Sequence, residues 1–293
     1  MKKLLPIIFI LILISCSKEV PLEVLPEQIV VRNETSYLVN SMEPFTGTTV
    51  SYHDNGQLEY TGIYKNGKLD GLVEKYDFNG QLRYKVNIKN GKDVGLHEYY
   101  YDNGQLHLRW NYKNGKKNGL HENYYDNGQL INKENYKDGK LEGLQEKYSY
   151  NGQLQSRFTF KDGKQEGLQE RYNDNGQLKF KNNYKNGKEE GLQKRYYDNG
   201  QLLYKGNIKD GKLEGLHESY HENGQLLTRS TFKDGVEALG EMFYDNGQLR
   251  WRRNYKNGKK EGLHESYNRD GSSMGDICYK NDLQVDISYC EAK

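Results

Sequence analysis

The stretch LVEKYDFNGQLRYKVNI, residues 72–88, decides the fold, because apolar and polar residues alternate on both sides of an Asn-Gly pair. Such alternation over a short run is the pattern of a half-buried β-strand. An Asn-Gly pair between two runs of this kind is a strong signal for a β-hairpin. The stretch therefore predicts two antiparallel strands joined by a tight turn.

Two loop lengths are compatible with this Asn-Gly pair, and they differ in register. A two-residue loop would place Tyr76 opposite Arg83 and put the apolar rows of the two strands on opposite faces. A three-residue loop, with its glycine at a positive φ angle, places Tyr76 opposite Leu82 and unites the rows. We therefore predict the three-residue loop, and with it Leu72 opposite Val86.

The same unit recurs along most of the chain with a step of 24 residues, and with one step of 23 where a residue is missing between Gly235 and Glu237. A fixed period of this kind indicates a repeat array, in which each unit packs only against its neighbours. No proline occurs from Phe45 to Lys293, as a continuous ladder of strand hydrogen bonds requires. The Asn-Gly-Gln-Leu motif starts at Asn55, Asn79, Asn103, Asn127, Asn151, Asn175, Asn199, Asn223 and Asn246.

The composition indicates an ordered but thin molecule. Only 34% of the residues are hydrophobic and the mean hydropathy is −1.04, so a conventional core is not expected. The 26 tyrosines supply rings for packing and hydroxyls for water, and 12% aromatic residues argue against disorder. A net charge of +2 gives no reason to expect a nucleic-acid partner. We predict an all-β fold, an elongated single-sheet antiparallel β-meander of tandem 24-residue hairpins.

The N-terminus is different in kind. Two lysines after Met1 precede an apolar run over residues 4–14, which is typical of a secretory signal peptide and too short to be a permanent membrane span. The sequence Leu-Ile-Ser-Cys that ends at Cys16 resembles the lipobox of bacterial lipoproteins. This resemblance implies a signal peptide over 1–15, lipid attachment at Cys16 and the membrane as a partner. The alternative is an ordinary secretory signal that contains a cysteine.

Behind the signal, residues 16–37 contain two prolines and no clean periodicity, and we predict a tether there. Residues 38–293 are predicted to hold about ten repeats, the last of them a degenerate cap in which 269–273 replaces the usual turn. Cys278 and Cys290 lie in this cap. If the chain turns near Asn281, Cys278 faces a residue near Val285, so the simple register does not favour a disulfide.

No residue pattern indicates catalysis, because nearly every polar residue has several equivalent copies, whereas an active site needs one unique geometry. A recurrent glutamate row could be a carboxylate ladder for cations, but cross-strand pairing with lysines is the preferred interpretation, since Lys194 breaks the row. Histidines 97, 121, 217 and 264 share one repeat position. Equivalent positions lie two strands apart, roughly 10 Å, so no metal site and no cofactor are expected.

Units with Tyr-x-x-Asn-Gly-Gln-Leu, Tyr-Lys-Asn-Gly-Lys and Glu-Gly-Leu at this spacing resemble MORN repeats, and more closely the bacterial MORN variant of proteins labelled YwqK-type antitoxins. The resemblance covers roughly 45–283 and implies a curved meander of MORN-type hairpins, used for membrane attachment, scaffolding or protein contact. We expect a non-enzymatic lipoprotein of the cell envelope, in the outer membrane if the cell is Gram-negative, that binds a protein or an envelope polymer. The alternative is an antitoxin or immunity protein that neutralises a toxin by direct contact. The rows of Tyr and Leu either hold the sheet together or line a groove for peptide or glycan.

Overall fold

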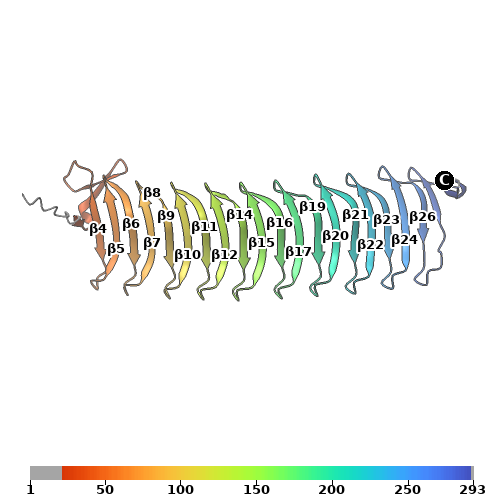
Figure 1. Ribbon diagram of the computed structural model, residues 1–293, viewed down its shortest axis with the longest axis horizontal. Helices are drawn as coiled ribbons and strands as arrows, with labels where there is room; N and C mark the ends of the chain where they lie inside the picture. Colours follow the sequence, from red (N-terminus) through yellow and green to blue (C-terminus); the bar gives the residue numbers. More distant parts are fainter. Residues whose placement is uncertain (1–21, 292–293) are drawn as a thin grey trace, which may run out of the picture.

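The computed structural model describes residues 22–291, and the predicted signal peptide and Cys16 lie outside this range. Over the described residues, the chain forms one long sheet of 26 strands and a separate two-stranded hairpin. The strands run across the long axis of the molecule, and successive units follow one another from one end to the other (Figure 1). This confirms the predicted all-β, single-sheet architecture. Within the same residues, no helix has the length and apolar character needed to cross a membrane.

The strands of the sheet follow the chain order. The hairpin outside the sheet consists of β2 (Ile29–Arg32) and β3 (Thr35–Leu38), and two short helices are η1 (Pro26–Gln28) and α1 (Ser288–Glu291). The sheet is formed by β1 (Glu23–Val24), β4 (Gly47–Tyr52), β5 (Leu58–Lys65), β6 (Lys68–Tyr76), β7 (Leu82–Lys89), β8 (Lys92–Asp93), β9 (Gly95–Tyr100), β10 (Leu106–Lys113), β11 (Lys116–Tyr124), β12 (Leu130–Lys137), β13 (Lys140–Leu141), β14 (Gly143–Tyr148), β15 (Leu154–Lys161), β16 (Lys164–Tyr172), β17 (Leu178–Lys185), β18 (Lys188–Glu189), β19 (Gly191–Tyr196), β20 (Leu202–Lys209), β21 (Lys212–Tyr220), β22 (Leu226–Lys233), β23 (Val236–Phe243), β24 (Leu249–Lys256), β25 (Lys259–Lys260), β26 (Gly262–Ser266), β27 (Ile277–Lys280) and β28 (Leu283–Val285).

The Asn-Gly-Gln-Leu turn has the predicted length. Between β6 and β7, the N–H of Asp77 donates to the carbonyl of Gln81 at 2.9 Å, and the N–H of Gly80 donates to the carbonyl of Asp77 at 2.9 Å. Gly80 has a φ of +78°, a value that side chains disfavour. Tyr76 lies opposite Leu82, so the three-residue loop and its closing pair are confirmed.

The rest of the register differs from the prediction. The pairing shifts by one residue next to Tyr76, so Leu72 lies opposite Asn87, and Val86 lies opposite Val73. The predicted pair of Leu72 with Val86 is therefore wrong. The reason is a β-bulge, which places two residues of one strand against one of its partner and moves the following side chains to the other face. As a result, the apolar rows of the two strands lie on opposite faces of the sheet.

At the other edge, the strands are joined by two-residue loops. Between β5 and β6, Asn66 and Gly67 have φ angles of +50° and +75°, and Lys65 lies opposite Lys68. This combination is the type I′ hairpin turn, whose twist matches that of the strands it connects. Each full repeat thus alternates a three-residue loop at one edge with a tight turn at the other.

The first strands carry additional structure on the outer side. In the segment for which the sequence predicts a tether, β1 pairs in parallel with β4, with Glu23 opposite Thr48. The N–H of Ser36, in the hairpin of β2 and β3, donates to the carbonyl of Gly67 at 2.8 Å. Phe45, which follows this hairpin, is only 3% exposed. Residues 22–38 are therefore folded against the first repeat.

The last repeat is closed by a disulfide between Cys278 and Cys290, whose Cα atoms lie 6.0 Å apart. Val285 lies opposite Cys278, as the sequence indicates. The expectation against a bridge is nevertheless wrong, because the chain turns back after β28, and the short helix α1 brings Cys290 beside Cys278. The cap thus ends in a covalent clamp rather than in a further strand.

Candidate binding faces

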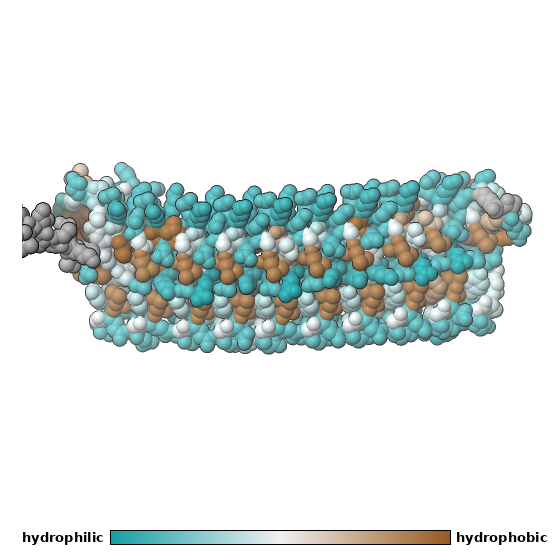
Figure 2. Space-filling model, in the orientation of Figure 1, coloured by the Kyte–Doolittle hydropathy of each residue, from teal (hydrophilic) through white to brown (hydrophobic). Residues whose placement is uncertain are grey.

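The sheet is a single layer, so each of its two faces has its own row of side chains. We call constant face the one that carries the leucine, glutamate and tyrosine equivalent to Leu72, Glu74 and Tyr76 in nearly every unit. We call variable face the opposite one, which carries the residues equivalent to Val73 and Val86. Figure 2 shows bands of polar and apolar residues that run along the whole molecule, as a repeated pattern of this kind produces.

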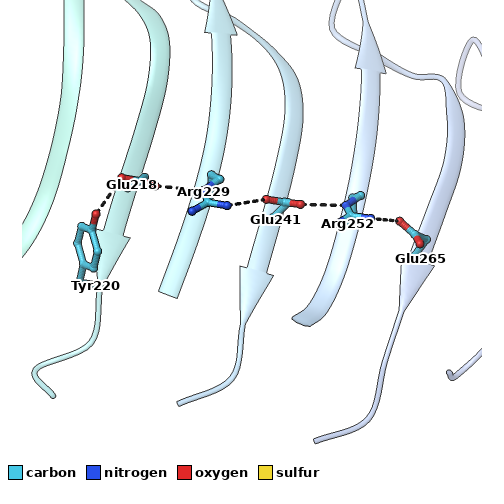
Figure 3. A network of polar contacts seen from close by, with 6 residues as sticks. All are labelled: Glu218, Tyr220, Arg229, Glu241, Arg252 and Glu265. Carbon is cyan, nitrogen blue, oxygen red and sulfur yellow. Dashed lines mark hydrogen bonds and ion pairs between the residues drawn. The ribbon is translucent and has the colours of Figure 1, made fainter. Parts of the chain in front are cut away.

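A ladder of alternating charges runs along the constant face. Glu218 accepts a hydrogen bond from the Tyr220 hydroxyl at 2.8 Å and pairs with Lys205 at 2.7 Å and Arg229 at 3.1 Å. Figure 3 shows that the ladder continues through Glu241 towards the C-terminal cap. The predicted cross-strand pairing of the glutamate row is confirmed, with arginines as partners in addition to the expected lysines. Further ion pairs of the ladder are Lys85–Glu98, Arg109–Glu98, Arg109–Glu122, Arg157–Glu146, Lys181–Glu170, Arg229–Glu241, Arg252–Glu241 and Arg252–Glu265.

The ladder keeps its carboxylates charged although they are largely buried. Glu98 is 4% exposed and Glu218 is 6% exposed. Burial raises the pKa of Glu218, but the hydrogen bonds from Lys205, Tyr220 and Arg229 outweigh it, so that the pKa lies below its usual range. Both flanking cations are more than one third exposed, so solvent weakens each single ion pair. The ladder stabilises the sheet mainly because the whole row of charges is neutralised and its side chains are held in place.

The recurrent histidines brace the backbone from the variable face. The Nε2 atom of His121 lies 2.8 Å from the carbonyl oxygen of Asn111, beside the register shift that follows Trp110. Glutamine reaches the same place, since the Nε2 of Gln169 donates to the carbonyl of Thr159 at 3.0 Å. Burial is the largest cause that lowers the pKa of His121, and this favours the neutral ring as the donor. The sequence contains a sign of this role, because His and Gln alternate at one repeat position. Both side chains carry a nitrogen that can reach the same backbone carbonyl.

We expect His121→Gln to leave the free energy of unfolding nearly unchanged and His121→Leu to lower it by about 1–3 kcal/mol, the cost of a buried carbonyl that loses its donor. Urea unfolding followed by circular dichroism measures both values. Equal losses in the two variants would show that the imidazole acts by packing and not as a donor.

The Asn-Gly-Gln-Leu loops also hold one another. The side chain of Asn103 accepts a hydrogen bond from the N–H of Gln105 at 3.0 Å and donates to the carbonyl of Asp126, in the next loop, at 2.7 Å. On the constant face, the side chain of Asn87 donates to the carbonyl of Leu96 at 2.7 Å. The recurrent polar residues are thus occupied by the connections within and between units.

An aromatic strip, formed by Tyr84, Tyr99, Trp110, His121 and Tyr136, lies on the variable face. Neighbouring rings along it have centroids 4.7 to 6.2 Å apart, and the ammonium group of Lys117 lies 4.3 Å above the Trp110 ring. Such ring distances are those of favourable aromatic pairs. Sequence reasoning followed the tyrosine row of the constant face and missed this strip, because its members occupy positions that differ from unit to unit.

The variable face changes chemically along its length. At the position of Trp110, successive units carry Gly62, Val86, Trp110, Glu134, Phe158, Asn182, Gly206, Ser230 and Arg253. The variable face is therefore the surface on which one stretch of the array differs from another.

Within residues 22–291, no group of three or more His, Cys, Asp or Glu side chains is placed to hold a metal ion.

Several solved structures resemble this chain at low sequence identity. The complex "TcdB2-TccC3" is 12% identical, with a TM-score of 0.19, over 86% of this chain and 17% of that chain. "TcdB2-TccC3-Cdc42" is 13% identical, with a TM-score of 0.20, over 84% and 14%. A Photorhabdus luminescens Tc holotoxin pore is 12% identical, with a TM-score of 0.20, over 82% and 14%. This chain spans less than a fifth of those chains, and scores this low carry no argument about function.

No curated protein matches the chain at a significant level. The family described as MORN repeat variant matches nine consecutive segments, at residues 45–66, 69–90, 93–114, 117–138, 141–162, 165–186, 189–210, 213–234 and 237–259. These segments coincide with the hairpin units of the sheet and together cover more than half of the sequence. The chain therefore belongs to the MORN repeat variant family.

Proposed function

We propose that the protein is a non-enzymatic lipoprotein of the cell envelope, attached to a membrane through acylated Cys16, whose repeats bind a protein or an envelope polymer. Tandem MORN repeats suggest a repetitive binding or scaffold surface. The observation that carries the proposal is that the two faces of the sheet have different roles. The constant face holds the units together, whereas the variable face presents a different set of side chains in each unit.

The aromatic strip is the part of the variable face best suited to a ligand. Its rings belong to the paired strands β7, β9, β10, β11 and β12. Four of them, Tyr84, Tyr99, Trp110 and Tyr136, are half-buried and remain partly open to solvent, whereas His121 is buried. Aromatic side chains contribute strongly to binding because they are large and rigid. Trp110 also donates its indole N–H to the side chain of Asn123 at 2.8 Å, which fixes the orientation of the ring.

The place of the anchor fits this use of the array. The first strands lie at one end of the long axis and the cap lies at the other (Figure 1). A lipid anchor ahead of Leu22 would hold the array by its first repeat and leave both faces accessible. The lipobox-like sequence at Cys16 supports this attachment, and two or more acyl chains suffice for stable anchoring.

The test combines Cys16→Ser with site-specific photo-crosslinking in intact cells. We expect the wild type in the membrane fraction and Cys16→Ser in the soluble fraction. A crosslinker at Leu108, beside Tyr99 on the variable face, should capture one defined partner, and Trp110→Ala should abolish the capture. A crosslinker at Leu144, on the constant face, is the matched control.

Several outcomes would contradict the proposal. Identical fractionation of the wild type and Cys16→Ser would rule out the lipid anchor. Equal capture from Leu108 and Leu144, or capture that survives Trp110→Ala, would rule out the aromatic strip as the binding surface. A toxin captured at Leu108 would give the protein an immunity role instead of a scaffold role.

A further inference from the structure

The charge ladder of the constant face repeats one arrangement of groups around a glutamate carboxylate. In unit after unit, a glutamate carboxylate accepts a hydrogen bond from the tyrosine two residues later and pairs with a cation of an adjacent strand. Glu170 does so with Tyr172 at 3.1 Å, and Glu146 with Tyr148 at 3.0 Å. The place of the carboxylate on this face is therefore defined many times over.

The first unit has Val50 at the position of this glutamate, and among the later units the carboxylate is missing at one. Lys194 stands there in place of glutamate, and it lies opposite Lys181 on one side and opposite Lys205 on the other. The ammonium groups of these two lysines are directed to the far sides, where they pair with Glu170 at 3.3 Å and Glu218 at 2.7 Å. Three adjacent strands thus present cations without an intervening anion.

In the unit that has Lys194 in place of glutamate, two side chains lack the partner that the equivalent side chains have in other units. Within residues 22–291, Lys194 has no carboxylate partner, and the hydroxyl of Tyr196 has no hydrogen-bond partner, whereas the hydroxyl of Tyr220 donates to Glu218. Like charges directly opposite one another destabilise a sheet. A carboxylate placed beside Tyr196 would accept a hydrogen bond from its hydroxyl and neutralise the charge of the lysines on either side.

We propose that Lys181, Lys194, Lys205 and Tyr196 form a binding site for a carboxylate group that an acidic protein segment presents. Elsewhere the lysines and arginines of the ladder are largely neutralised by its own glutamates. The constant face therefore offers a local site for one or two anions and not a broad basic surface. A membrane of anionic lipids would require the latter. The ligand carboxylate takes the place that Glu218 or Glu170 occupies in its own unit.

The residues beside this site indicate that the ligand is a protein segment with apolar side chains next to its carboxylate. Leu192 and Leu216, on the same face, are 40% and 47% exposed, and they are the most exposed leucines of their row; the next is Leu144 at 38%. An acidic residue with an apolar neighbour two positions away would engage both features at once, because alternate residues of an extended segment point to the same side. This site lies on the constant face, is independent of Cys16 and goes beyond the proposed function.

The test measures binding of the purified full chain to a fluorescent hexapeptide of alternating Leu and Glu, with the Leu-Gln peptide as a blank. We expect the Leu-Glu peptide to bind and Lys194→Glu to weaken it about tenfold or more, as loss of a charge-assisted contact predicts. Lys209→Glu is the matched control, because it makes the same charge change at an exposed position beyond the ladder. It should alter the affinity less than about twofold, since an exposed charge outside the site is screened.

Thermal unfolding separates this result from a folding defect. Lys194→Glu should raise the midpoint of unfolding, because it restores the alternation of charges, whereas Lys209→Glu should not. Equal peptide affinities of the two variants would overturn the site. Binding of polygalacturonate or of phosphatidylglycerol vesicles, lost with Lys194→Glu while the Leu-Glu peptide does not bind, would overturn the assignment to a protein segment.

Discussion

Thr228→Pro is expected to lower the free energy of unfolding by about 3 kcal/mol or more. Thr228 lies inside β22, opposite Ser219 on one neighbouring strand and Met242 on the other. Because the strand is paired on both sides, its N–H has a partner whichever way it points, and proline removes this donor. Neighbouring repeats support only each other, so a break here should uncouple the last repeats from the rest of the array. Urea unfolding followed by circular dichroism should then show two transitions.

The controls for this experiment come from the same repeat. Thr228→Val removes the hydroxyl that contacts Ser219 and keeps the backbone donor, so it should cost about 1 kcal/mol. Glu222→Pro places proline at the second position of the three-residue loop's type I turn, where its φ angle is suitable, and it should be tolerated. If Thr228→Pro unfolds in one transition at the wild-type midpoint, β22 is not an interior strand.

Replacing Cys278 and Cys290 by serine together should lower the stability of the cap by about 2–4 kcal/mol. The two residues are 12 positions apart, and their bond closes a loop that contains β28 and most of α1. Cys278 is 1% exposed, so serine also puts a hydroxyl into a buried place. Hydrogen exchange should increase in β26–β28 and remain unchanged in β4–β7, at the other end of the array.

Dithiothreitol added to the wild type is the control for the second change, because it opens the bond without altering a side chain. The same increase in exchange after reduction would assign the effect to the covalent clamp. An unchanged cap in both experiments would contradict a stabilising role of the disulfide.

The sequence predicted the parts of the fold that depend on short-range chemistry. The alternation around Asn79-Gly80 indicated two strands. The three-residue loop was chosen because it unites the apolar rows, and the loop is confirmed although the register shift places those rows on opposite faces. The opposition of Glu and Lys across strands also followed from the period, and Lys194 was recognised as the break. These features depend on residues that are close in sequence or related by a fixed step.

Features that depend on register and on the path of the chain were not predicted. The bulge beside Tyr76 has no single residue that marks it, and it alone decides whether Leu72 meets Val86 or Asn87. The bridge of Cys278 with Cys290 depends on the return of the chain after β28, which a strand register cannot show. The aromatic strip was missed because its rings occupy positions that differ from unit to unit, and only the true register places those positions on one face.

The orientation of the strands has a mechanical consequence. Hydrogen bonds between neighbouring strands are perpendicular to the strands, and here they point along the long axis of the array (Figure 1). A pull between the two ends passes through every strand interface in turn, but it is applied to one end of the outermost strand, so the hydrogen bonds of that strand are loaded and opened one after another. An array held at its first repeat and drawn at its cap would therefore lengthen strand by strand, and it would resist stretching far less than a sheet sheared along its strands.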